Sequence, residues 1–128
     1  MAGSRAGYLF STFPDMNGEY LPFKLMQNTT TAASFLDHPV AIHFMHRNLA
    51  YLVTLAVLGL WFKGRKVCPP RATRGLNLMA AMVLAQLTLG IWTVVSGVQL
   101  HVAVAHQGGA LLLLTLGIFT AHALRRQA

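Results

Sequence analysis

Three long apolar segments constrain the fold of this chain more than any other feature of its sequence. They cover residues 39–62, 76–95 and 102–124. At ~1.5 Å of rise per helical residue, each segment is long enough to cross a hydrocarbon core of ~30 Å. Because backbone amides in lipid must be hydrogen-bonded within their own segment, each segment is predicted to be a transmembrane helix. We therefore predict an all-α integral membrane fold with three transmembrane helices.

The composition excludes an ordinary soluble domain. Hydrophobic residues make up 55% of the 128 residues and charged residues only 10%, whereas a soluble domain carries about 25% charged residues. The net charge of +7 would suit nucleic acid, but basic residues dispersed through an apolar chain are more typical of membrane orientation. We therefore expect no nucleic-acid partner. The single cysteine excludes an internal disulfide framework.

The charged residues divide the chain into two parts and predict its orientation. Residues 1–38 hold all three acidic residues and form an expected polar segment on the outer side, followed by a transmembrane domain over residues 39–128. The loop 63–74 between the first two predicted helices carries five of the ten basic residues. By the positive-inside rule, this loop and the C-terminus are expected on the cytoplasmic or matrix side of a bacterial cytoplasmic membrane or a mitochondrial inner membrane.

Two histidines inside the apolar segments are the leading candidates for chemistry, because ionisable residues in membrane helices are functional candidates by default. His46 lies near the outer end of the first segment and His106 near the outer end of the third. Both predicted helices run inward from the outer side, so the two imidazoles are expected at a similar shallow depth. Such a pair could bind one planar cofactor from both faces, and we predict that His46 and His106 are the axial ligands of a haem iron.

Small residues close to each histidine are consistent with a slot for this cofactor. Ala50 lies one turn after His46, and Gly109 and Ala110 lie about one turn after His106. Small side chains would leave room for a flat macrocycle beside each imidazole. The alternative is that these residues only allow the helices to pack closely.

Arg47 is costly within an apolar span unless it is paired. Its planar guanidinium would suit a haem propionate near the outer interface, since arginine matches the geometry of a carboxylate. Alternatively, its long side chain reaches the interface or pairs with Asp37. Both interpretations are compatible with the sequence.

The remaining residues predict no catalytic group. The apolar part holds no nucleophile–base pair, no paired carboxylates and no phosphate-binding glycine loop. Any reaction would therefore depend on a bound haem to carry the chemistry or the electron.

Four stretches, taken in order, resemble the haem A synthase family. Residues 44–51 (FMHRNLAY) are similar to the His-Arg segment that opens the sixth membrane helix of that family. Residues 89–94 (LGIWTV) resemble a stretch of the seventh helix, and residues 100–110 (LHVAVAHQGGA) resemble the Ala-x-x-His-Gln stretch that opens the eighth. Residues 6–8 (AGY) together with residues 13–18 (FPDMNG) are similar to the loop after the fifth helix.

The resemblance implies a fold and a function. Such synthases look like two four-helix halves, and the C-terminal half resembles a part that holds haem b between two histidines, which correspond to His46 and His106. They oxidise the C8 methyl group of haem O to the formyl group of haem A for cytochrome c oxidase. This chain corresponds to only the last three helices. The half that binds haem O, with its glutamate, is therefore expected from a separate polypeptide unless the chain is a fragment.

Partners and alternative functions follow from the same observations. Three helices cannot enclose a haem on all sides, so we expect a homo- or hetero-oligomer with further helices, in contact with membrane lipid. The resemblance also implies a ferredoxin-type electron donor, which the basic loop 63–74 could attract, although orientation alone explains that charge. Two other functions stay open: a b-type cytochrome membrane anchor like that of succinate dehydrogenase, and a haemless structural subunit of a respiratory complex.

Overall fold

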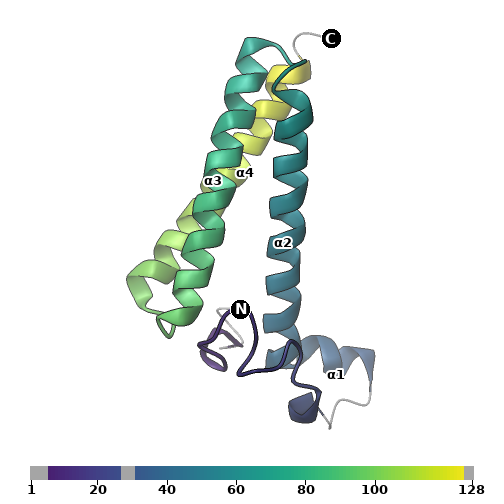
Figure 1. Cartoon of the computed structure of the whole chain (residues 1–128), viewed down its shortest axis with the longest axis vertical. Helices are drawn as coiled ribbons and strands as arrows, with labels where there is room; N and C mark the ends of the chain where they lie inside the picture. The colour runs from purple at the N-terminus through teal and green to yellow at the C-terminus, as the bar shows by residue number, and fades with distance from the viewer. Residues whose placement is uncertain (1–5, 27–30, 126–128) are drawn as a thin grey trace.

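A computed structural model describes residues 6–26 and 31–125 of the chain. Three helices of 26 residues each dominate this part (Figure 1), and it contains no β-strand beyond one isolated bridge. In chain order, the elements are the 3-10 turns η1 (Ala6–Tyr8) and η2 (Phe23–Met26), the short helix α1 (Ala32–Asp37), and the long helices α2 (Pro39–Gly64), α3 (Pro70–Val95) and α4 (Leu100–Arg125).

The three long helices are each long and apolar enough to cross a membrane. At ~1.5 Å per residue, 26 residues extend about 39 Å, which exceeds the hydrocarbon thickness of ~30 Å. The predicted all-α architecture with three transmembrane helices is therefore confirmed.

The connection between α2 and α3 is shorter than the sequence predicts. We expected the second helix to start at residue 76, but α3 starts at Pro70. Proline is favoured in the first helical turn because its missing N–H would have no partner there. Arg71 and Arg74 therefore lie on the first two turns of α3 rather than in a loop.

The helices form an open arrangement rather than a closed bundle. Helices α3 and α4 lie side by side, whereas α2 approaches α3 near their connection and diverges from it toward its own first residues (Figure 1). Close packing of α3 on α4 depends on glycine: a Cβ at Gly75 would collide with the hydroxyl of Thr120. The first turns of α2 lie farther from α3 than its last turns do (Figure 1).

The outer surfaces of the helices suit lipid. Helix α4 buries only Val102, Thr120 and Ala123 within the structure. The threonine hydroxyls do not offer polar surface, because they donate to carbonyls one turn earlier: Thr54 donates to the carbonyl of Ala50 at 2.8 Å. These faces are compatible with hydrocarbon without further partners.

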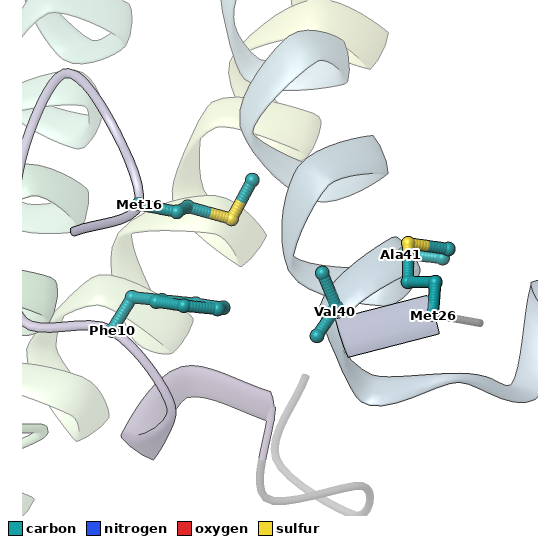
Figure 2. Packing of buried hydrophobic residues seen from close by; sticks show 5 residues of the cluster. All are labelled: Phe10, Met16, Met26, Val40 and Ala41. Carbon is teal, nitrogen blue, oxygen red and sulfur yellow. The ribbon is translucent and has the colours of Figure 1, made fainter. Parts of the chain in front are cut away.

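The expected polar segment 1–38 also contributes apolar packing where it is described. Phe10, Met16 and Met26 form a buried cluster with Val40 and Ala41 at the start of α2 (Figure 2). The segment is therefore folded against α2 and is not only a solvated extension.

The expected division at residue 38 coincides with a helix junction. His38 ends α1 and caps α2, and its Nδ1 accepts a hydrogen bond from the Val40 amide at 3.3 Å. Pro39 occupies the first helical position of α2. The change of direction between α1 and α2 follows from the extended backbone of His38 (φ −73°, ψ 127°).

Candidate functional site

The imidazoles of His46 on α2 and His106 on α4 lie close together and line the same cavity. Their ring centroids are 6.4 Å apart and their planes are inclined by 84°. A metal–imidazole bond is about 2.0 Å long and the bonded nitrogen lies about 1.1 Å from its ring centroid, so two rings on opposite sides of one metal ion have centroids about 6.2 Å apart. The observed spacing matches that value.

A cavity of about 820 Å³ surrounds the two imidazoles and is lined mainly by apolar side chains. Small-molecule sites typically measure about 300–1,000 Å³ and are mostly apolar with a few polar groups, so this cavity is large enough for a cofactor. Five of the six predicted site residues line it: His46, Arg47, Ala50, His106 and Ala110.

Gly109 is not part of the cavity wall. A Cβ at this position would lie 2.8 Å from Cε of Met82 and 3.0 Å from Nε2 of Gln86, so Gly109 faces α3. At 100° per residue, Gly109 and Ala110 lie on either side of the direction of His106, and only Ala110 points into the cavity. For Gly109 the structure shows the close helix packing of the alternative interpretation.

Arg47 is buried and binds backbone carbonyls of the N-terminal segment. Its Nη1 donates to the carbonyls of Pro14 (2.6 Å) and Asp15 (2.8 Å), and its Nη2 donates to the carbonyl of Thr12 (3.3 Å). Nη2 also lies 3.3 Å from Nε2 of His43. The folded N-terminal segment supplies these acceptors, and among the described residues Arg47 forms no ion pair with Asp37.

His43 is fully engaged by other groups. It is 1% exposed, and its Nδ1 lies 3.2 Å from the carbonyl of Ala6. Arginine can only donate, so Nε2 of His43 accepts from Arg47 and the ring proton resides on Nδ1, which donates to Ala6. His43 is therefore a structural residue, although it lies less than one turn from His46.

Some residues of the site were not singled out from the sequence. Tyr8 and Phe13 of the N-terminal segment line the cavity, as does Gly90 of α3. The aromatic residues within an otherwise polar segment were a usable signal for a folded cover. Nothing local marks Gly90, because its role depends on which residue of α4 lies opposite.

The donor set fits a metal held mainly by a macrocycle. In the described residues, no group of three or more His, Cys, Asp or Glu side chains could hold a bare metal ion. Two imidazoles at the right spacing in a cavity with apolar walls suit an iron whose other four ligands belong to a porphyrin. Nδ1 of His106 is buried without a hydrogen bond of good geometry among these residues, although the backbone carbonyl of Gln86 lies near the ring. A ligand histidine commonly directs this second nitrogen at a carbonyl.

Comparison with known proteins identifies the same family that the sequence resembles. The model of the cytochrome oxidase assembly protein family (COX15-CtaA) matches residues 1–118. No solved structure matches the chain significantly. The match favours the synthase resemblance over a membrane anchor of the succinate dehydrogenase kind.

Individual relatives are named Heme A synthase. The chain is 38% identical to that of Nitrosospira multiformis over 128 residues, which cover 99% of this chain and 36% of the relative. It is 40% identical to that of Cereibacter sphaeroides over an alignment of 134 positions, gaps included, which covers 95% of this chain and 34% of the relative. The chain thus spans about a third of the length of the curated relatives it matches. Together with the three membrane-spanning helices, these matches show that the chain belongs to the cytochrome oxidase assembly protein family that includes the haem A synthases.

Proposed function

We propose that this chain is the haem-b-binding C-terminal part of a haem A synthase, with His46 and His106 as the axial ligands. The spacing of 6.4 Å between the two ring centroids carries the proposal, since it leaves room for one iron between the rings. The names of the relatives support a role in haem A formation for cytochrome c oxidase.

Each residue of the site then has a defined task. His46 and His106 would hold the haem iron, and the small side chains of Ala50 and Ala110, which line the cavity, would leave space for the macrocycle. A haem with two imidazole ligands supplies one-electron transfer, since it has no coordination position left for oxygen. Arg47 binds the N-terminal segment, residues 6–26, which covers the cavity, and presents a positive charge to the cavity.

The oxidation of the C8 methyl group of haem O requires groups that this part does not hold. The described helices contain no carboxylate within their membrane-spanning residues. We therefore propose that haem O and its catalytic acid are held by further helices, in the same polypeptide or a second one. Those helices would close the cavity on the side where α2 diverges from α4.

The proposed orientation places the α2–α3 connection and the C-terminus on the cytoplasmic or matrix side. The α2–α3 connection and the last turns of α4 lie at the same end of the molecule (Figure 1). Lys63, Arg65 and Lys66 are at this end, whereas the described acidic residues lie at or before Asp37 at the opposite end. This distribution follows the positive-inside rule.

The experiment that tests the proposed function is an optical spectrum of the protein purified from its native membrane, with the haem extracted and identified. We expect a low-spin b-type haem in the wild type and its loss in His46→Ala and in His106→Ala. His101→Ala is the matched control, because His101 is exposed on the first turn of α4 and does not line the cavity. A wild type without haem, or a spectrum that His106→Ala leaves unchanged, would refute the assignment.

A further inference from the structure

The imidazole of His106 packs against the backbone of α3 at Gly90. A Cβ built on Gly90 would lie 3.0 Å from Cε1, 3.5 Å from Nε2 and 3.7 Å from Nδ1 of His106. Carbon atoms at their optimal van der Waals separation are about 3.5–4.0 Å apart. Any side chain at position 90 would therefore push the ring away from its present position.

Gln86, one turn before Gly90 on the same helix, binds the backbone of the same histidine. Its Nε2 donates to the carbonyl of His106 at 2.9 Å, and its side chain is only 7% exposed. The backbone carbonyl of Gln86 also lies near the His106 ring. Helix α3 thus contacts both the main chain and the imidazole of His106.

His46 has no comparable support. Its residue is exposed in the described structure, whereas His106 is half-buried. Helix α3 therefore supports the His106 side of the site.

We propose that Gly90 and Gln86 are positioning residues, which hold the His106 imidazole at the place and angle that a shared iron requires. The proposal rests on the proposed function, because it assumes that His106 is an iron ligand. Ligand groups must be held within about 0.5 Å and 10–20° of their working geometry. A displacement of a few tenths of an ångström by alanine, and a larger one by valine, would reach that limit.

Weaker formation of helix α3 cannot explain an effect of Gly90→Ala, because this substitution should stabilise the helix. Alanine favours the helical conformation more than glycine does. A shift of the midpoint potential or the low-spin signal of the haem in Gly90→Ala would therefore come from the ring contact and not from weaker helix formation.

The test compares Gly90→Ala and Gly90→Val with Gly59→Ala and Gly59→Val. Gly59 is the matched control, because it lies within α2 and a Cβ there meets nothing within 4 Å. We expect Gly90→Val to weaken haem retention about tenfold, in the range seen when groups that orient metal ligands are removed. We expect Gly90→Ala to keep the haem but to shift its midpoint potential and its low-spin electron paramagnetic resonance signal, while both Gly59 variants match the wild type.

The same substitutions in a His106→Gly variant test whether Gly90 positions the imidazole or only allows the helices to pack. In His106→Gly with free imidazole added, the ligand is no longer attached to α4 and can adapt to a side chain at position 90. We expect Gly90→Ala to have no effect on the imidazole-restored haem. An effect of the same size in both backgrounds would overturn the positioning role.

The two proposals fail in distinguishable ways. A wild type without low-spin haem refutes the proposed function and with it the role of Gly90. A haem-loaded wild type whose Gly90→Val variant retains haem as well as Gly59→Val refutes the positioning role alone.

Discussion

Arg47 and His43 lie one turn apart on α2, with Nη2 of Arg47 3.3 Å from Nε2 of His43. Each of them also binds the N-terminal segment: His43 binds the carbonyl of Ala6 and Arg47 binds those of Pro14 and Asp15. A positively charged group inside a membrane protein is expensive unless its donors are satisfied. The pair therefore couples the outer end of α2 to the cover over the cavity.

Arg47→Lys should loosen this cover. Lysine keeps the charge but lacks the planar fork that reaches several carbonyls at once. Since each hydrogen bond to a charged group contributes about 1.5–3 kcal/mol, we expect at least about tenfold faster amide exchange over residues 6–26 in detergent. Arg65→Lys is the control, because Arg65 stacks on Trp61 at the other end of α2. Equal exchange in both variants would contradict the role of Arg47.

His43→Phe should lower stability and leave the low-spin haem spectrum in place. The substitution deprives Arg47 and the Ala6 carbonyl of a partner, which costs about 1–3 kcal/mol for each buried group left unpaired. His46→Phe should instead abolish the low-spin spectrum. Thermal unfolding followed together with haem absorbance distinguishes the two residues, and loss of the spectrum in both variants would show that His43 has a further role.

Ala110→Phe should exclude the cofactor, because residue 110 lines the cavity. We expect a fall in haem per chain of at least about tenfold without loss of helical circular dichroism, since the added ring occupies space that is open in this structure. Gly109→Ala should act differently. Its Cβ would press on Met82 and Gln86, so we expect a destabilisation of about 1–3 kcal/mol, the usual cost of overpacking. Haem content and unfolding measured on both variants check the distinction.

Cys68 provides a test of orientation, since it is the only cysteine in the chain and lies in the connection between α2 and α3. A membrane-impermeant thiol reagent should label it in inverted vesicles and not in intact cells. Gln99→Cys in a Cys68→Ser background is the control, because residue 99 is exposed in the opposite connection and should show the reverse pattern. Labelling of Cys68 from the outside would reverse the proposed orientation.

The membrane helices could be predicted from sequence because their cause is local. An apolar run of sufficient length must form a helix in lipid whatever surrounds it. The errors lie at the ends, as with α3, which starts at Pro70 instead of residue 76. The apolar run does not include Arg71 and Arg74, so the sequence did not predict the first turns of α3. A membrane helix can continue beyond the hydrocarbon, where polar residues are tolerated.

The sequence by itself determined that this chain has three membrane-spanning helices, since apolar length is a property of one segment, and it predicted a similar depth for His46 and His106. Only the tertiary structure decided which neighbours each residue meets. Gly109 packs on α3 while Ala110 lines the cavity, and Gly90 makes room for His106. These outcomes depend on the rotation and inclination of one helix relative to another, which arise from contacts between residues far apart in the chain.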